Sequence, residues 1–551
     1  MAIADHCDVL IVGGGPCGLM LANELGRRGI RLVLVDAKPG TAFNPQANAT
    51  QARTMEHFRR LGFADEIRSL GLPPEFPTDI AYFTRYAGHE LARFALPSAN
   101  QARDRVSGLT GSWSAAELPH RVSQKFVEAV LRRQAEQLPG VSIHYGFRLV
   151  SFSETGDGVE AVVECVADGR RHRVWSHYLV GADGPRSSIR EALGFSYQGE
   201  AGTVRDFMGG PMQAIYVRAP AFYRVVPHAP AWMNVAFNRQ RRAFMAAVDG
   251  KGEFAFHTQL KAFEKPEAVN DASALAMFQA AVGVPVAAEI LSRGTWTAGH
   301  ALVADGFQRG RVFLAGDAVH LFTPTGGLGY NTAIEDAVNL GWKLAATLCG
   351  YGGPALLSSY QAERRPLALR NTGFARQFAD SLGTFQPAAE IEADSTEGAA
   401  ARRAAGHYFD RHARAEFNIP GITFGGRYDG SPIIAPDGST PPADAANSYT
   451  PTACPGGRPP HAWIADDKSL FDTFGFGWTL LRLGRNPPGC EALRHEAQRV
   501  GAELTVVDIA DAAVRDLYEA DLALIRPDQI VAWRGDVIAD AARLMARVTG
   551  H

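Results

Sequence analysis

Cysteine is scarce in this chain. Only six cysteines occur among its 551 residues, and no two of them form a CxxC pair. Such scattered thiols exclude a disulfide framework and a cysteine-rich zinc site, and they fit a reducing compartment. We therefore expect a cytoplasmic protein that holds no metal ion.

Long apolar runs and an excess of charge of one sign are also missing. The first apolar stretch, Val9 to Val12, is too short for a signal peptide or a membrane span. The 55 basic and 58 acidic side chains leave a formal net charge of −3. This balance gives no electrostatic footprint for nucleic acid or an anionic membrane, so we expect neither as a partner.

The chain has enough apolar material for more than one core. Its hydrophobic fraction is 46%, which is ordinary for a globular protein. A length of 551 residues is too great for one core, so two or three domains are expected.

The first forty residues predict a βαβ unit. Val9 to Val12 is a short apolar strand, Leu19 to Arg28 has helical spacing, and Gly29 ends that helix. Ile30 to Val35 reads as a second strand that finishes at Asp36. Units of this kind build parallel sheets.

The turn of this unit carries the glycines of a GxGxxG motif, Gly13, Gly15 and Gly18. The first permits a tight turn, the second lets a pyrophosphate approach the backbone, and the third lets helix and strand pack closely. The helix N-terminus attracts the phosphates, and Asp36 has the spacing of an acid that binds a ribose hydroxyl. The motif indicates a dinucleotide without distinguishing FAD from NAD.

A second block, Gly310 to Leu344, suggests a flavin site. Val312 to Ala315 reads as a buried strand that ends at Gly316-Asp317, where a carboxylate can accept a hydrogen bond from a polyol hydroxyl. The glycine-rich loop that follows would let a flat ring lie on its backbone. Thr332 to Glu335 fits a capping box, so we expect a helix to begin there, with its positive end favouring a reduced, anionic flavin.

Together, GGGPCG, YLVGADGPRSSIR around Asp183 and the Gly310 to Leu344 block resemble the aromatic hydroxylases, which are single-component FAD-dependent monooxygenases. The resemblance extends over the whole chain. Its end, with SLFDTFG and IRPDQIVAWRG, is similar to the phenol-hydroxylase-like branch with a thioredoxin-like tail. That tail has no CxxC, so it cannot exchange disulfides.

The resemblance implies FAD as cofactor, with NADPH or NADH as co-substrate that binds transiently. Gln46 departs from the family, which often has a basic residue there, and Arg53 could supply the charge instead. The expected cofactor-binding residues are Gly13, Gly15, Pro16, Gly18, Asp36, Ala37, Lys38, Gln46, Arg53, Gln124, Asp183, Gly184, Gly316, Asp317, Pro324, Gly327, Leu328, Gly329, Tyr330 and Asn331.

The residues that touch substrate are less evident. A phenol needs a base or an acceptor that favours its phenolate form. Tyr216 and His257 lie in segments that alternate, so one strand face could present them to a pocket. We take these two residues and Pro324 as the catalytic candidates, with an ordinary strand or loop position as the alternative for each.

The predicted fold is α/β with α+β insertions: a Rossmann-type FAD-binding domain, an inserted antiparallel β substrate domain and a C-terminal thioredoxin-like domain. The expected divisions are FAD-binding parts at 1–75, 119–190 and 301–380, substrate-domain parts at 76–118 and 191–300, a connecting segment at 381–460, and the thioredoxin-like domain at 461–551.

These features predict an NAD(P)H-consuming monooxygenase that uses O2 to hydroxylate a phenolic or other electron-rich aromatic compound. By resemblance, a flavin C4a-hydroperoxide would transfer the oxygen. The alternatives are an FAD-dependent dehydrogenase, reductase or halogenase, or a flavin-binding protein without activity. A homodimer is a further expectation.

Overall fold

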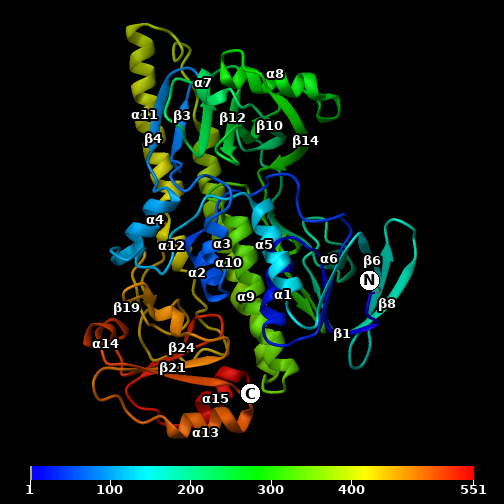
Figure 1. The fold of residues 1–551 in the computed structure, drawn as a ribbon, viewed down its shortest axis with the longest axis vertical. Coiled ribbons are helices and arrows are strands. Elements are labelled where there is room, and N and C mark those ends of the chain that lie inside the picture. Colours follow the sequence, from blue (N-terminus) through cyan, green and yellow to red (C-terminus); the bar gives the residue numbers. More distant parts are fainter. Residues whose placement is uncertain (1–2) are drawn as a thin grey trace.

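The computed structural model describes residues 3–551 and shows three parts stacked along its long axis (Figure 1). A mainly antiparallel sheet, in which β11 (Met233–Phe237) and β3 (Ile80–Phe83) pair in parallel, lies at one end. A mainly parallel sheet with its helices lies in the middle, and a smaller α/β module lies at the other end. The middle part contains the predicted dinucleotide motif, and the other two parts lie at its two ends.

The middle part is organised around β1 (His6–Val12). This strand pairs in parallel with β2 (Leu32–Asp36) on one side and with β8 (Arg171–Gly181) on the other. β5 (Val141–Tyr145) and β17 (Val312–Leu314) continue the parallel order outward. The continuous apolar runs fit strands that are covered on both faces. At the margins lie β16 (Gln308–Arg309) and the hairpin of β6 (Phe147–Glu154) and β7 (Val159–Cys165).

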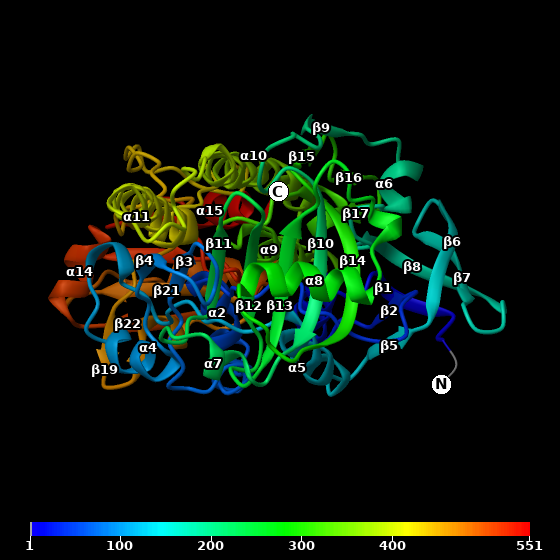
Figure 2. The same cartoon turned by 90° about the horizontal axis from the view of Figure 1, so that it is seen from above.

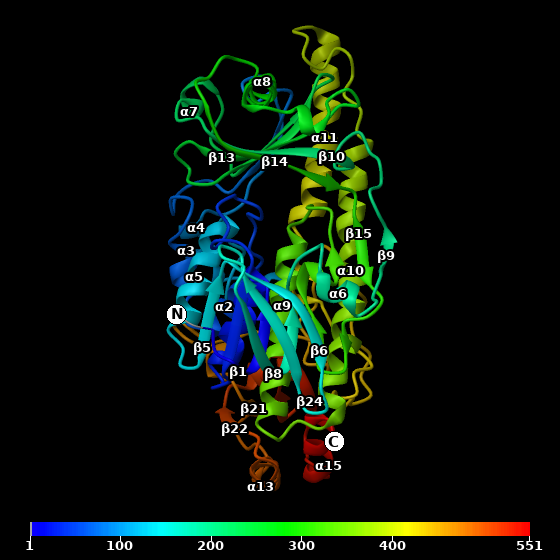
Figure 3. The ribbon, with the colours of Figure 1, turned by 90° about the vertical axis from the view of Figure 1, so that its right-hand side faces the viewer.

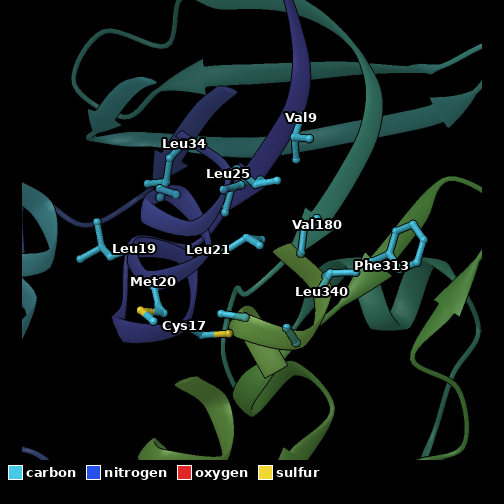
Figure 4. Close-up of a cluster of buried hydrophobic side chains, with 14 of the residues drawn as sticks. Val9, Cys17, Leu19, Met20, Leu21, Leu25, Leu34, Val180, Phe313 and Leu340 are labelled. Carbon is cyan, nitrogen blue, oxygen red and sulfur yellow. The ribbon is translucent and has the colours of Figure 1, made fainter. Parts of the chain in front are cut away.

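Helices cover this sheet and close its core. α1 (Pro16–Gly26) packs between α5 (Gln124–Glu136) and α9 (Leu328–Leu348), and α9 packs in turn on α10 (Pro354–Thr384). Figure 4 shows side chains from strands and helices meeting in one cluster. Shorter helices of the same part are α2 (Ala52–Arg60), α3 (Ala64–Arg68) and α6 (Ser188–Ala192).

The start of α9 corrects the sequence prediction. The helix begins at Leu328, one turn before the capping box expected at Thr332 to Glu335. Its N-cap is Gly327, which has the left-handed conformation (φ +64°) and no capping side chain. Thr332 instead donates from Oγ1 to the carbonyl of Leu328, 2.9 Å away, inside the helix. Because a glycine N-cap has no side chain, no capping motif in the sequence marked the true start of α9.

The end sheet has the order β14-β10-β13-β12-β11-β3-β4. Its last two strands come from the segment expected as the first part of the substrate domain. Figures 2 and 3 show α8 (Asp271–Val282) on the outer face and the middle part facing the inner one. The strands are β3 (Ile80–Phe83), β4 (Glu90–Phe94), β10 (Gly210–Arg218), β11 (Met233–Phe237), β12 (Arg242–Ala247), β13 (Glu253–Gln259) and β14 (Glu289–Ala298).

The segment interpreted as a connection is structured. Residues 396–417 form the 22-residue helix α11 (Thr396–Phe417), which packs on β4 and closes one end of the inner sheet face. Phe409 of this helix stacks on Tyr82 of β3 with ring centroids 4.6 Å apart. The Ala- and Arg-rich sequence therefore supports the end sheet, while 425–460 forms turns and irregular chain with no helix or strand. Between them lies α12 (Pro420–Phe424).

The C-terminal module is thioredoxin-like. β21 (Trp478–Leu483) and β22 (Leu504–Ile509) are parallel and joined by α13 (Glu491–Val500). An antiparallel pair of strands continues the sheet in the order β22-β21-β23-β24. The remaining elements are α14 (Ala512–Tyr518), β23 (Leu522–Ile525), β24 (Val531–Gly535), α15 (Ala541–Thr549) and a small hairpin of β19 (Trp463–Ala465) and β20 (Lys468–Ser469). Further short elements elsewhere are α4 (Ala99–Val106), α7 (Phe222–Val225), β9 (Tyr197–Glu200), β15 (Ala301–Ala304) and β18 (His320–Leu321).

Candidate functional site

The glycines after β1 form a cradle for a pyrophosphate. At Gly13 (φ +115°) a Cβ would lie 2.0 Å from the carbonyl oxygen of Ala182, and at Gly18 a Cβ would lie 1.9 Å from that of Gly13. At Gly15 the same atom would meet nothing within 4 Å. Tight packing at the outer two glycines and open space at the middle one match the three roles predicted for them.

The N-terminus of α1 is free to bind an anion. Gly15 is its N-cap, Pro16 is its first residue, and no side chain caps its N–H groups. Gly15 and Pro16 are both partly exposed. Uncapped N–H groups and the helix dipole suit the phosphates of a dinucleotide.

Asp36 at the end of β2 already holds the neighbouring turns. Its Oδ2 accepts from the Gly14 N–H at 2.6 Å and its Oδ1 accepts from the Lys38 N–H at 2.7 Å. Each carboxylate oxygen retains a lone pair for a ribose hydroxyl. Ala37 and Lys38 lie exposed beside it, so all three predicted residues border the same cradle.

Two loops from distant parts of the sequence meet across the cradle. In the first, Asp183 precedes Gly184 (φ +84°), and burial raises the pKa of the Asp183 carboxyl. Its Oδ1 is buried and has no hydrogen-bond partner in the described chain. An orphaned carboxylate oxygen at this place fits a hydroxyl or amide of a bound cofactor.

The second loop carries Gly316 and Asp317. The Asp317 side chain is reached by solvent, yet enough protein surrounds it for desolvation to raise the pKa of its carboxyl. No donor within residues 3–551 bonds to its carboxylate, while its backbone carbonyl accepts from the Tyr197 hydroxyl at 2.5 Å. Arg190 lies over the Tyr197 ring and donates to the carbonyls of Pro185 and Ala318, at 3.2 and 3.3 Å, which joins the two loops.

Buried charges that no sequence motif indicated support the second loop. Asp336 of α9 accepts from the Gly316 N–H at 3.1 Å, from Arg364 Nε at 2.8 Å and from His320 Nε2 at 2.7 Å. Burial opposes its ionisation, but the nearby charges of His320 and Arg364 outweigh burial and lower the pKa of Asp336. A charged residue on the apolar face of a helix was the available signal.

The loop from Pro324 to Asn331 is built for a close approach by the backbone. Gly326 and Gly327 both have φ +64°, and Pro324 is exposed. A Cβ at Gly327 would lie 2.9 Å from the Cβ of Ala49, so the segment that follows β2 occupies one side of this loop. Leu328, Gly329 and Tyr330 form the first turn of α9, with Leu328 buried and the other two partly exposed.

The side chain of Asn331 is held by other parts of the chain. Its Nδ2 donates to the carbonyls of Ala49 and Gly327 at 2.9 and 2.6 Å, and its Oδ1 accepts from the Gln51 N–H and the Thr54 hydroxyl at 2.8 and 2.7 Å. These bonds use the whole carboxamide. Asn331 therefore ties two loops together, which leaves only its backbone for a cofactor contact.

The remaining predicted cofactor residues divide into two groups. Gln124 begins α5, and its side-chain amide donates to the Glu128 carboxylate at 2.7 Å. Its backbone N–H donates to the carbonyl of Ala47, so Gln124 lies near the exposed Gln46. Arg53 instead is buried against the C-terminal module, where its Nη2 donates to the carbonyls of both Asp528 and Gln529. This position does not favour the charge contact expected from Arg53.

The inner face of the end sheet lies opposite these loops. Tyr216 and His257 share that face, since Ala214 pairs with His257 two residues before Tyr216 on β10. Five adjacent strands each place one partly exposed residue on the same face, with outward-facing neighbours that are buried on every strand but β14. The five are Trp296, Ala214, His257, Phe244 and Met233.

The Tyr216 hydroxyl is poorly placed to act as a base, because it already forms two hydrogen bonds within the protein. The hydroxyl donates to Glu253 and accepts from Lys125 Nζ at 2.8 Å. Burial, followed by the hydrogen bond to Glu253, raises the pKa of Tyr216. The structure thus fixes Tyr216 at the junction of the sheet with α5, whereas His257 and its neighbours on this face are partly exposed.

An anion-binding cradle, two carboxylate loops and a glycine loop at a helix N-terminus define a dinucleotide-dependent flavoprotein. Comparison with known families agrees. A model described as "FAD binding domain" matches residues 6–375, and one described as "Aromatic-ring hydroxylase, C-terminal" matches residues 452–551. The chain belongs to the FAD-dependent aromatic-ring hydroxylases, a family of monooxygenases with FAD as cofactor.

Individual relatives match along almost the full chain. Phenol 2-monooxygenase from a Pseudomonas species is 30% identical over 97% of this chain and 90% of that protein. Aklavinone 12-hydroxylase RdmE from Streptomyces purpurascens is 32% identical over 99% of this chain and 98% of that protein. The solved structure of the rebeccamycin biosynthetic enzyme RebC with reduced flavin is 32% identical, covers 100% of both chains and has a TM-score of 0.88. Across residues 3–551, no helix is both long and apolar enough to cross a membrane.

Proposed function

We propose that this protein is an NAD(P)H-consuming monooxygenase that hydroxylates a phenolic aromatic compound with several fused rings. The size of the substrate is inferred from the partly exposed surface on five adjacent strands of the end sheet. Neighbouring strands are separated by about 4.8 Å, so this surface spans roughly 19 Å. That width exceeds a single phenol ring. The named substrate of a relative, aklavinone, supports the same class.

In the proposed reaction, one atom of O2 enters the aromatic ring and the other leaves as water. NAD(P)H supplies two electrons and becomes NAD(P)+, and one proton is taken from solvent. Bound FAD supplies the redox chemistry that passes these electrons to O2. The electron-rich ring gains a hydroxyl group in place of a hydrogen atom.

The residues of this chain bind FAD, orient the substrate and exclude water from it. The uncapped N-terminus of α1 suits the pyrophosphate, and Asp36 and Asp317 can accept hydrogen bonds from hydroxyls of FAD. The uncapped N-terminus of α9 favours negative charge near the glycine loop. The apolar inner face of the end sheet orients the substrate ring and keeps water from it.

The experiment is oxidation of NADPH and of NADH by the purified, FAD-loaded protein with O2, with and without added phenols. A panel of phenol, 1-naphthol and alizarin compares one, two and three rings. We expect the larger phenols to stimulate oxidation and to yield a product heavier by one oxygen atom, which 18O2 labels. Stimulated oxidation that yields only hydrogen peroxide with every phenol would contradict the proposal.

A further inference from the structure

His257 lies on the middle one of the five strands, among the partly exposed side chains on the inner face of the end sheet. Its imidazole stacks on the ring of Phe244, with centroids 4.6 Å apart and an interplanar angle of 6°. The indole of Trp296 meets it edge-on, with centroids 5.8 Å apart. One aromatic ring thus supports the imidazole from its face, and the other holds it from its edge.

A hydrogen bond from Trp296 decides which nitrogen of His257 carries the proton. The Trp296 Nε1 lies 3.1 Å from the His257 Nδ1. Because an indole N–H can only donate, Nδ1 must accept with its lone pair. The neutral imidazole therefore carries its proton on Nε2, which has no hydrogen-bond partner among the described residues.

The surroundings keep this imidazole neutral. Burial lowers the pKa of His257 to about 4, and no charged group contributes to that shift. The strands packed against it present Ala214, Phe244 and Trp296, and none of these side chains is charged. At neutral pH His257 therefore offers an N–H donor at Nε2 and has no free lone pair.

We propose that His257 donates a hydrogen bond from Nε2 to the hydroxyl oxygen of a fused-ring hydroxyaromatic substrate. The hydrogen bond stabilises that oxygen in its phenolate form. The role rests on the proposed function, and it differs from the base or acceptor that the sequence suggested. The substrate O–H bond breaks, its proton passes to solvent water, and the oxygen keeps the electron pair that accepts the N–H. Trp296 is a positioning residue, because it acts only through the tautomer of His257.

The hydrogen bond from His257 favours the ionised form of the substrate. A phenolate oxygen accepts a hydrogen bond more strongly than a neutral hydroxyl does, so the donor lowers the pKa of the bound phenol. An electron-rich phenolate ring is also the better substrate for an electrophilic oxygen atom. His257 would therefore prepare the substrate for the proposed hydroxylation without taking a proton itself.

The test uses alizarin, a three-ring phenol whose colour changes when it ionises. Alizarin is titrated spectrophotometrically while bound to the FAD-loaded protein, in the wild type and in His257→Phe, which keeps a stacking ring but has no N–H. We expect the ionisation midpoint of bound alizarin to lie about one pH unit lower in the wild type, a tenfold change in its ionisation constant.

Two further variants separate the hydrogen bond from packing. Trp296→Phe keeps a ring but loses the indole N–H, so an intermediate midpoint is expected because His257 can then adopt either tautomer. His257→Gln keeps an N–H donor and should recover part of the shift. The flavin absorbance of each variant verifies that it folds and holds FAD.

The outcomes distinguish this inference from the proposed function. Equal midpoints in the wild type and His257→Phe, or a wild type that does not bind alizarin, would overturn the donor role even if phenols are still hydroxylated. A lowered midpoint in a protein that hydroxylates no phenol would support the donor and contradict the proposed reaction.

Discussion

Asp317 shows what the structure adds at the scale of a single residue. Its carboxylate lies at the end of the short strand β17, where burial raises its pKa and no protein donor within 3–551 satisfies it. An acceptor held in this state has most to gain from a ligand hydroxyl. Asp36 differs, because backbone N–H groups already bond to both of its oxygens.

Asp317→Ala should weaken FAD binding. The lost hydrogen bond to a charged acceptor is worth roughly 1.5 to 3 kcal/mol, so the Kd for FAD should rise about tenfold or more. Fluorescence titration of the apoprotein with FAD measures this. Asp466→Ala, in the exposed turn between β19 and β20, is the matched control and should leave the Kd unchanged. Equal affinities in both variants would remove Asp317 from the site.

At the scale of elements, α9 connects the flavin loop to the rest of the molecule. Its first turn begins directly after Gly327, and Asn331 and Asp336 hold the chain after β2 and the Gly316 loop, respectively. The helix therefore brings the chain after β2 to the Gly316 and Gly327 loops, which lie far from that segment in sequence. Its sequence showed a glycine-rich start, but only the packing showed what each polar residue holds.

Gly327→Val should impair flavin reduction or oxygen transfer more than folding. The left-handed backbone and the close approach of Ala49 make any Cβ unfavourable there, by roughly 1 to 3 kcal/mol. Stopped-flow measurement of both half-reactions in the FAD-loaded variant tests this. Gly373→Ala is the control, since Gly373 lies in α10 and a Cβ there meets nothing within 4 Å. Normal rates for Gly327→Val would mean that the glycine only begins the helix.

At the scale of the whole molecule, buried charges join the C-terminal module to the flavin part. Arg526 donates to both carboxylate oxygens of Glu363 at 2.7 and 2.9 Å, and Lys343 Nζ donates to the same group at 2.6 Å. Asp528 completes the group through Arg526. The module is therefore part of the folded core, although it contributes no residue to the cofactor cradle.

Arg526→Met should destabilise the protein strongly. Removing one partner leaves Glu363 and Asp528 buried with too little positive charge, which costs about 3 to 5 kcal/mol. The melting temperature of the FAD-loaded protein measures the loss. Arg543→Met, at an exposed position of α15, makes the same substitution without a buried partner. If both variants melt alike, the network does not stabilise the junction.

Stability should also fall on mild acidification. Burial lowers the pKa of His120 and His461 to about 3 and that of His257 to about 4. Below pH 6.5 the unfolded state binds protons that the native state does not, so each histidine removes about 2 kcal/mol by pH 5 and nothing above neutral pH.

Melting temperatures between pH 7.5 and pH 5 test this dependence. Asp336 and Glu363 do not contribute in this range, because their pKa values are lowered. His120→Gln should make the dependence shallower, since it removes one of the histidines whose pKa is lowered by burial. A dependence as steep as in the wild type would show that His120 is not the neutral, buried group that the structure indicates.

The sequence by itself predicted the elements whose signals are local. Strand β1, the glycine turn and Asp36 lie within forty residues, so hydrophobic period and glycine spacing were enough to place them. The strands of the C-terminal module were predictable for the same reason. The family, too, followed from motifs, because its cofactor contacts depend on short stretches of backbone.

Only the tertiary structure decided which side chains remain free to act. Asn331 and Arg53 looked available in the sequence, but the fold uses both to join segments separated by hundreds of residues. His257 looked like a base until Trp296, from another strand, fixed its proton. Whether a polar atom is free depends on its partners in space, and a sequence pattern specifies residue types without specifying those partners.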